Sequence, residues 1–268
     1  MKSSFSPLDM KWVAENSSPK IIGSRLHYYS EIDSTNNRAK ALAEESAPEG
    51  SLVITDYQTA GRGRENRKWV SPAKQNLLFS FILRPPPILQ NAPQITTIAA
   101  VAICDTIRKE TRLRNTMIKW PNDIRIGEKK VAGILTEMKT LKKRIEFVVV
   151  GIGININISK EDFPESIRET STSLFIEAKK HIEREKFFVH LMQTLDDYYR
   201  VVISNGFDSI HLLWKEMSDM PGKLVRIENS ANVIEGYIMD IDTDGGLLIR
   251  EKDGLTQKVF SGEIKILN

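Results

Sequence analysis

The run Leu77–Leu83 (LLFSFIL) constrains the fold most strongly, because an apolar segment of this length is typical of a buried strand. Pro85, Pro86 and Pro87 follow and end it, since proline cannot donate to a strand ladder. Two later helices are predicted from apolar residues at helical spacing, over 188–202 and 210–217. A core helix is predicted directly after the prolines from Ile95, Ile98, Ala99, Ala102, Ile103 and Ile107.

Strands and turns account for most of the remaining chain up to residue 157. A short strand at Arg25–Tyr29 and a β-rich segment at Ser51–Tyr57 lie on either side of a helix that Ser34 can cap. Residues 1–20 are polar and predict an arm. Turn signals then separate four segments that predict an antiparallel meander, at Met117–Lys119, Ile124–Ile126, Lys130–Lys139 and Ile145–Asn157.

Composition changes at Pro221 and Gly222, where short strands separated by turn signals begin. We predict a small barrel that closes its own edges, and two domains, 1–219 and 220–268. The expected turns are Asn229-Ser230, Asp244-Gly245-Gly246 and Asp253-Gly254. The expected strands are Lys223–Glu228, Val233–Ile241, Leu247–Arg250, Gln257–Phe260 and Ile264–Leu267.

Composition excludes several classes of protein. The net charge of +3, from 38 basic and 35 acidic residues, is too small to indicate nucleic-acid binding by itself. Cys104 is the one cysteine, so no intrachain disulfide can form, and its place beside a buried helix face predicts a small hydrophobe rather than a nucleophile. No stretch is apolar enough to cross a bilayer, and the N-terminus lacks a signal-peptide core. We therefore expect a cytoplasmic protein.

The most informative segment is Gln58–Trp69 (QTAGRGRENRKW), here called the basic loop, which holds three arginines and a lysine within residues 62–68. Gly61 and Gly63 allow the backbone to come close to a ligand and to point successive N–H groups at an anion. Arginine binds carboxylate or phosphate through two parallel hydrogen bonds. The basic loop is therefore suited to hold two anions together while one attacks the other.

Other interpretations of the basic loop must be considered. It is not a dinucleotide-binding fingerprint, because Asn66 stands at the third glycine position and a strand follows. The chain contains no Walker A pattern. An RNA-binding arginine–glycine loop and a merely solvated charged loop both stay open on this segment alone.

Four further segments strengthen the functional interpretation. Asp33–Asn36 (DSTN) lies between a strand and a helix, and Lys119–Asp123 (KWPND) interrupts an apolar strand. Lys130–Leu135 (KVAGIL) places a lysine at the start of a strand. Gly151 and Gly153 lie within a strand, which suggests a ligand against the sheet.

In these segments the chain resembles the biotin–protein ligase family. The resemblance covers most of residues 30–157, and Ser261–Ile264 also resembles the family's C-terminal domain. It implies an α/β (α+β) fold with a mixed, largely antiparallel sheet and flanking helices, as in class II aminoacyl-tRNA synthetase-like ligases, plus a C-terminal SH3-like β-barrel. One departure is Asn66, which stands where the family loop usually has glycine. Asparagine tolerates positive φ better than most residues.

The resemblance implies an ATP-dependent ligase with two half-reactions. The carboxylate of biotin attacks the α-phosphorus of ATP, which gives biotinyl-5′-AMP and pyrophosphate. A lysine of the biotin carboxyl carrier domain of a carboxylase then attacks the mixed anhydride and releases AMP. Mg²⁺ would accompany the phosphates, because no protein cage for a metal is apparent. Metal-ligand spacing is absent among the four histidines, His27, His181, His190 and His211.

The resemblance also implies roles for individual residues. The expected catalytic residues are Arg64, Asp123 and Lys130, with Asp123 orienting or deprotonating the acceptor lysine. The expected biotin-binding residues are Ser34, Thr35, Asn36, Gln58, Gly61, Arg62, Gly63, Lys130, Gly133 and Gly151. The expected ATP-binding residues are Arg64, Arg67, Trp69, Lys119, Asn122, Asp123, Lys130 and Asn155.

Three alternative functions stay open. A lipoate–protein ligase shares the architecture and differs in the pocket for the substrate tail. A repressor of biotin genes needs an N-terminal winged helix, and only about 20–30 residues precede the first motif, so we expect a monofunctional ligase that does not bind DNA. The hypothesis of a nonspecific RNA-binding protein rests on the basic loop alone. Exposed sheet edges would allow a homodimer, while the carboxylase partner and the role of the barrel do not follow from the sequence.

Overall fold

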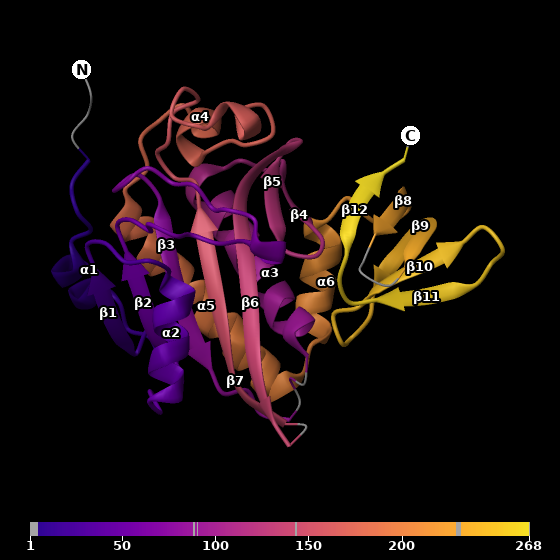
Figure 1. Ribbon diagram of the computed structural model, residues 1–268, viewed down its shortest axis with the longest axis horizontal. Helices are drawn as coiled ribbons and strands as arrows, with labels where there is room; N and C mark the ends of the chain where they lie inside the picture. Colours follow the sequence, from indigo (N-terminus) through magenta and orange to yellow (C-terminus); the bar gives the residue numbers. More distant parts are fainter. Residues whose placement is uncertain (1–4, 88, 90, 143, 229–231, 268) are drawn as a thin grey trace.

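The computed structural model describes residues 5–87, 89, 91–142, 144–228 and 232–267. Its main feature is a seven-stranded sheet (Figure 1). Only β1 and β2 pair in parallel among the neighbouring strands of this sheet, which confirms the mixed, largely antiparallel sheet. The strand order is β1 (Arg25–Tyr29), β2 (Ser51–Thr55), β3 (Leu77–Leu83), β7 (Arg144–Ile154), β6 (Lys129–Leu141), β5 (Asp123–Ile126) and β4 (Thr116–Lys119).

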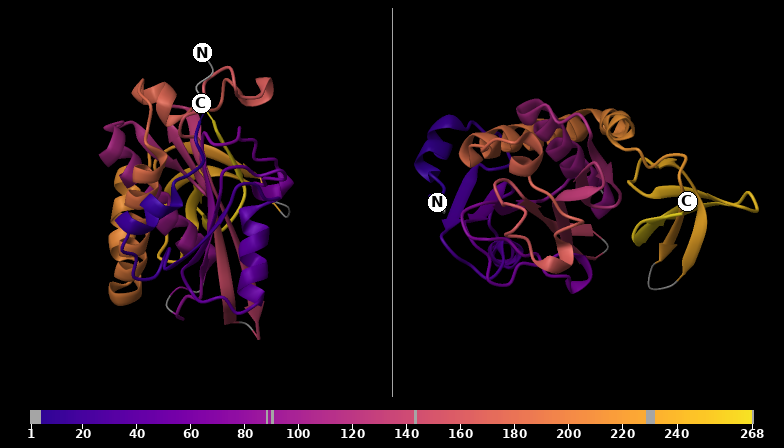
Figure 2. Two further views of the ribbon diagram at one scale, coloured as in Figure 1. Left: turned by 90° about the vertical axis from the view of Figure 1, so that its left-hand side faces the viewer. Right: turned by 90° about the horizontal axis from the view of Figure 1, so that it is seen from above.

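Helices cover both faces of this sheet, as its edge-on view shows (Figure 2). Successive strand residues point to opposite faces. Val53 and Ile82 therefore join a small core with α2, while Leu52 and Phe81 join the large core beneath the other helices. On that side Cys104 is completely buried, as predicted. The covering helices are α2 (Thr35–Glu44) on one face, and α3 (Ala92–Thr111), α5 (Arg184–Asn205) and α6 (Asp208–Met217) on the other.

The N-terminal region differs from the predicted polar arm, because it contains α1 (Met10–Asn16). Asp9 caps this helix by accepting a hydrogen bond from the backbone N–H of Trp12. Leu8 and Val13 are buried, so the prediction of an arm was wrong. The short elements that remain are η1 (Arg64–Asn66), η2 (Glu165–Ile167) and α4 (Leu174–Ala178).

Ser34 stands at the N-cap position of α2 with an extended backbone, as predicted. Its hydroxyl group makes no capping hydrogen bond, however, so the predicted capping role was wrong. The backbone N–H of Thr35 instead donates to the side chain of Gln58. The start of α2 is thus tied to the basic loop.

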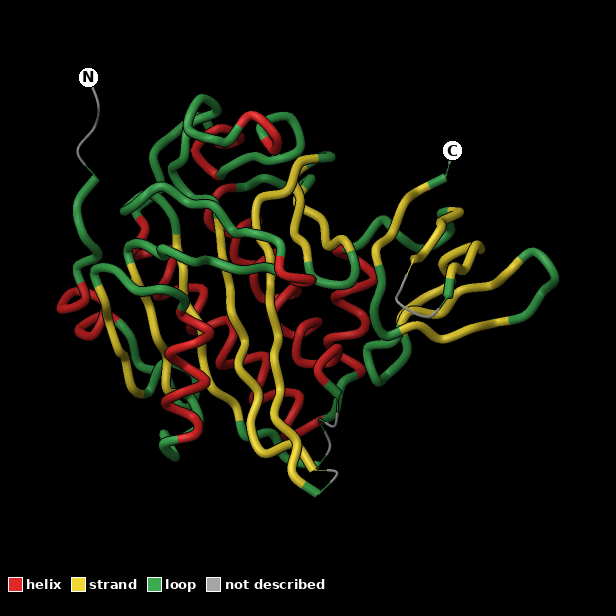
Figure 3. Tube along the Cα trace, in the orientation of Figure 1, coloured by secondary structure: helices red, strands yellow, loops and turns green. Residues whose placement is uncertain are grey.

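The C-terminal region forms a second, antiparallel sheet of five strands (Figure 3). In the described residues β11 and β12 lie at opposite ends of its ladder, so the barrel is not closed and the expectation of closed edges was wrong. The predicted turn Asn229-Ser230 lies outside the described residues. We propose the domain boundary at residues 219/220, between α6 and β8. The strand order is β11 (Thr256–Val259), β10 (Leu247–Glu251), β9 (Val233–Ile241), β8 (Leu224–Glu228) and β12 (Glu263–Ile266).

The turn between β9 and β10 holds the second sheet against the first. The side-chain amide of Gln94 donates to the carbonyl of Thr243 (2.7 Å), and the indole of Trp120 donates to that of Gly245 (3.4 Å). Asp240 on β9 accepts from His211 and Lys215 on α6. These contacts fix the second sheet beside the KWPND segment. No helix among the described residues is long and apolar enough to cross a membrane.

Candidate active site

A cavity of about 290 Å³ opens beside the start of α2, between the basic loop and the strands β5, β6 and β7. Gly262, Glu263 and Ile264 of the second sheet also line it. Every predicted site residue except Gly61 lines this cavity, namely Ser34, Thr35, Asn36, Gln58, Arg62, Gly63, Arg64, Arg67, Trp69, Lys119, Asn122, Asp123, Lys130, Gly133, Gly151 and Asn155.

The strand glycines of the cavity make room for protein side chains. Gly133 and Gly153 lie opposite each other on β6 and β7. A Cβ atom at Gly153 would lie 2.6 Å from the indole of Trp69, and one at Gly133 would lie 3.1 Å from it. Gly151 similarly leaves space for Asn36. The indole of Trp69 therefore rests directly on the two glycines, and its buried Nε1 has no hydrogen-bond partner among the described residues.

The basic loop is closed by its own backbone. The N–H of Gly63 donates to the carbonyl of Arg67 (2.7 Å), and the N–H of Trp69 donates to that of Gly61 (3.0 Å). A Cβ atom at Gly61 would lie 2.6 Å from the carbonyl oxygen of Trp69, so this glycine serves loop closure. Glu65 adopts the left-handed conformation, with φ of 53°.

Arginine and lysine side chains of the site are held by acidic and amide groups. Lys130 Nζ lies 2.5 Å from Asp123 Oδ1. Arg64 donates to the side-chain oxygen of Asn122 (3.2 Å), and burial lowers the pKa of its guanidinium group, which nevertheless stays protonated at neutral pH. Arg67 forms ion pairs of 3.0 Å with Glu65 and Glu263. This end of the cavity can therefore hold anionic groups.

The other end of the cavity offers mostly uncharged hydrogen-bonding groups. Gln58 Oε1 accepts from the backbone N–H of Thr35 (2.8 Å) and lies 3.0 Å from its hydroxyl. Arg62 donates to Asn37 (2.5 Å) and lies 3.8 Å from Glu137. This end can bind a neutral polar ring.

Two other predicted residues already have structural partners. The side-chain amide of Asn155 donates to the carbonyl of Thr172 (3.1 Å) and anchors the segment that follows β7. Lys119 on β4 lies opposite Asp123 on β5 in the strand register. Both residues therefore shape the cavity wall in addition to lining it.

Sequence reasoning missed several residues around the cavity. Phe163, Ile167 and Ser171 line it because Ser171 forms a parallel bridge with Lys130, a long-range contact that leaves no local pattern. Ser80 and Glu137 hold the side chains of Thr35 and Asn36. The sequence signal that could have identified Ser80 is its position as the polar residue of the otherwise apolar β3.

Two family models match the chain. Residues 28–155 match the biotin/lipoate A/B protein ligase family, and residues 222–267 match the biotin protein ligase C-terminal domain. The bifunctional ligase/repressor BirA of Bacillus subtilis is 38% identical over 247 residues, which cover 92% of this chain and 75% of the relative. The biotin–[acetyl-CoA-carboxylase] ligase of Paracoccus denitrificans is 30% identical over 224 residues, which cover 83% of this chain and 92% of the relative.

A solved structure agrees with these matches. The biotin protein ligase from Aquifex aeolicus in complex with biotin and ATP superimposes with a TM-score of 0.78 at 28% sequence identity. The match covers 91% of this chain and 99% of that one. The fold, the cavity and the sequence matches together show that the chain belongs to the biotin protein ligase family.

Proposed function

We propose that this protein activates biotin with ATP to biotinyl-5′-AMP and transfers biotin to a specific lysine of a biotin carboxyl carrier domain. The observation that carries the proposal is the combination of a neutral polar end and a cationic end in one cavity. A substrate with an uncharged ring and a terminal carboxylate matches that arrangement. The Aquifex relative, which binds biotin and ATP, supports the choice of substrates.

The cationic end would bring the two reacting anions together. Lys130 and Arg64 line the cavity and would meet the biotin carboxylate and the α-phosphate, whose mutual repulsion otherwise raises the barrier. Lys130 must exchange its partner Asp123 for the ligand. Arg67, released from Glu65 and Glu263, would meet the remaining phosphates.

The nucleotide would lie towards Trp69, Asn122 and Asn155, which line the cavity together with Lys130. Mg²⁺ would arrive on the phosphates. In the described part of the chain no group of three or more histidine, cysteine, aspartate or glutamate side chains could hold a metal ion. Asp123, the acidic group beside Lys130, fits an auxiliary contact to such an ion and not a cage.

In the second half-reaction the acceptor lysine must lose a proton, because an unperturbed lysine has a pKa of about 10.4. Asp123 lies at the cavity, and we assign it the role of orienting or deprotonating that amine. We place the reaction in the cytoplasm. The edge strands β1 and β4 of the large sheet would allow a homodimer.

Transfer is tested with a purified biotin carboxyl carrier domain. The protein is incubated with this domain, biotin and ATP, and labelled carrier is detected by streptavidin blotting. The matched control is a carrier in which arginine replaces the acceptor lysine. We expect label on the first carrier alone and only when ATP is present. Label on both carriers, or on neither, contradicts specific transfer.

A further inference from the structure

A chain of hydrogen bonds connects the carboxylate of Glu137 with the hydroxyl group of Thr35, a residue that lines the cavity. Its middle members are Ser80 on β3 and Asn36 on α2, and Ser80 lies directly opposite Gly151 on β7. A Cβ atom at Gly151 would lie 1.9 Å from Asn36 Oδ1, so this position has no room for a larger residue. Thr35, Asn36 and Ser80 are 4%, 4% and 0% exposed, so their polar atoms depend on one another.

The partners of Asn36 fix the orientation of its amide. Its Nδ2 donates to the backbone carbonyl of Leu135 (3.2 Å) and to Glu137 Oε2 (2.8 Å), which both accept. Its Oδ1 therefore faces Ser80 Oγ, at 2.6 Å. An amide oxygen can only accept, so the single hydroxyl proton of Ser80 is directed at Asn36.

The direction of the Ser80 hydroxyl proton determines the role of Thr35. Ser80 Oγ also lies 2.7 Å from Thr35 Oγ1, and one proton cannot serve both contacts. Thr35 must therefore donate its own proton within the wall, to Ser80 at 2.7 Å or to Gln58 Oε1 at 3.0 Å. What its hydroxyl group offers to the cavity is a pair of electrons, so Thr35 is a hydrogen-bond acceptor there.

The charge of Glu137 maintains this orientation of the Asn36 amide. Its Oε1 accepts from Lys40 Nζ (3.1 Å), and Arg62 lies 3.8 Å from its Oε2. Burial alone would raise the pKa of Glu137, but the hydrogen bonds from Asn36 and Lys40 outweigh it and lower that pKa below its usual value. An ionised carboxylate can only accept, so Asn36 must present its N–H group to it.

We propose that Ser80 and Glu137 are positioning residues that keep Thr35 a hydrogen-bond acceptor, so that the cavity selects a ring carrying an N–H donor. This inference rests on the proposed function, in which that donor belongs to the ureido ring of biotin. A dithiolane ring such as that of lipoate has no N–H group and would leave the acceptor buried without a partner. A site built to hydrogen-bond its substrate rejects analogues that lack the matching group.

Titration calorimetry on the full chain tests this proposal with three probes: biotin, biotin methylated on the ureido nitrogens, and lipoate. The variants are Ser80→Ala, Glu137→Gln and the double variant. Ser51→Ala is the matched control, because Ser51 on β2 is also completely buried and donates to the carbonyl of Pro48, away from the cavity. Glu137→Gln changes a partly exposed side chain and keeps the test valid if Ser80→Ala folds poorly.

We expect each single variant to weaken biotin binding by about 10- to 100-fold, the effect of one disturbed buried hydrogen-bond partner. Their losses should not add in the double variant, because they disturb one network. The preference for biotin over the methylated analogue should fall, the KM for biotin should rise, and kcat at saturating biotin and the KM for ATP should stay unchanged. Ser51→Ala should bind biotin as the unchanged protein does.

Two results would overturn this inference and leave the proposed function standing. One is unchanged biotin affinity in both single variants. The other is additive losses with an undiminished preference for biotin over the methylated analogue, which would indicate a purely structural role. If the unchanged protein fails to bind biotin at all, the proposed function fails, and this inference fails with it.

Discussion

The ammonium group of Lys130 lies 2.5 Å from the Oδ1 atom of Asp123 and 5.7 Å from the ring centre of Trp69. The two charged residues come from neighbouring strands, β6 and β5. Lys130 is thus held at the cavity by a partner that an anionic ligand can replace. In the proposed function, the adenylation step would depend on that exchange.

Replacing Lys130 by alanine should slow biotinyl-AMP formation by about 10²- to 10³-fold, the usual effect of losing one preorganised charge stabiliser. Single-turnover measurement of biotinyl-AMP checks this prediction. Lys130→Arg, which keeps the charge, should retain more activity than Lys130→Ala. A near-normal rate in Lys130→Ala would remove Lys130 from the mechanism.

Gly153→Ala should weaken nucleotide binding, because the added Cβ would lie 2.6 Å from the indole of Trp69 and displace it. Gly133→Ala is the milder variant for comparison. Its Cβ would lie 3.1 Å from the indole of Trp69, a distance that a small shift of the indole can relieve. We expect the KM for ATP to rise by about tenfold, or about 1.4 kcal/mol, in Gly153→Ala and by less in Gly133→Ala. Equal KM values in both variants and the unchanged protein would show that Trp69 does not contact nucleotide.

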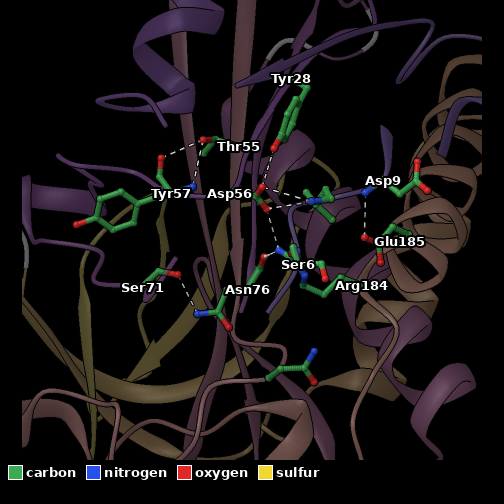
Figure 4. A network of polar contacts seen from close by, with 12 residues as sticks. Ser6, Asp9, Tyr28, Thr55, Asp56, Tyr57, Ser71, Asn76, Arg184 and Glu185 are labelled. Atoms are coloured by element: carbon green, nitrogen blue, oxygen red, sulfur yellow. Dashed lines mark hydrogen bonds and ion pairs between the residues drawn. The ribbon is translucent and has the colours of Figure 1, made fainter. Parts of the chain in front are cut away.

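A buried ion pair connects distant parts of the chain (Figure 4). Arg184 on α5 lies 3.1 Å from Asp56 Oδ1 and donates to the carbonyls of Ser6 and Asn76. The hydroxyl group of Tyr28 donates to Asp56 Oδ2 (2.7 Å). Asp56 stands two residues before Gln58, so the network supports the start of the basic loop.

Arg184→Met should lower the free energy of unfolding by about 3–5 kcal/mol, because it leaves the carboxylate of Asp56 buried without its cation. Urea denaturation measures this loss. The matched control is Lys11→Met, which removes an exposed ion pair with Glu15 and should cost less than about 1 kcal/mol. Similar losses in both variants would mean that the buried pair contributes no more than a surface pair.

Alkaline pH should destabilise the protein partly through Tyr28. Burial, the hydrogen bond to Asp56 and the charge of Asp56 raise the pKa of Tyr28 from 10.0 to about 12. The folded protein therefore keeps a proton that the unfolded chain releases, so this stabilisation is complete below pH 10 and is lost as the pH rises towards 12.

Unfolding free energies measured across that range should fall less steeply in Tyr28→Phe than in the unchanged protein. Some slope should remain, because burial also raises the pKa of Tyr198 and Tyr199. Identical slopes in the two proteins would contradict the assignment to Tyr28.

Local patterns predicted the large sheet and its helices well. The apolar β3 and the helical spacing in α3 reflect burial within one element, and such burial leaves a periodic signal. The helix α1 escaped prediction because it has only seven residues, of which Val13 is the buried one, and so few residues leave no periodic signal. The prediction of a closed barrel was wrong, because whether β11 pairs with β12 depends on three-dimensional geometry that leaves no local pattern.

The candidate site was largely predictable from motifs, yet the partners of its residues were not. The sequence indicated that Gly151 and Gly153 leave space against a strand, but not that the indole of Trp69 rests on Gly133 and Gly153. It indicated Lys130 and Asp123 as catalytic residues but did not show that they form an ion pair. Ser80 went unnoticed because a single serine in an apolar strand carries little information without the side chains opposite it.

The central claim, activation of biotin by ATP, is tested most directly by ATP–pyrophosphate exchange on the purified protein. Biotin, lipoate, octanoate or no acid is added in parallel. The structure predicts exchange with biotin alone, because only biotin offers a neutral N–H-bearing ring to Thr35 and a carboxylate to Lys130. Exchange with lipoate or octanoate instead, or with no acid at all in well-folded protein, would contradict the proposed function.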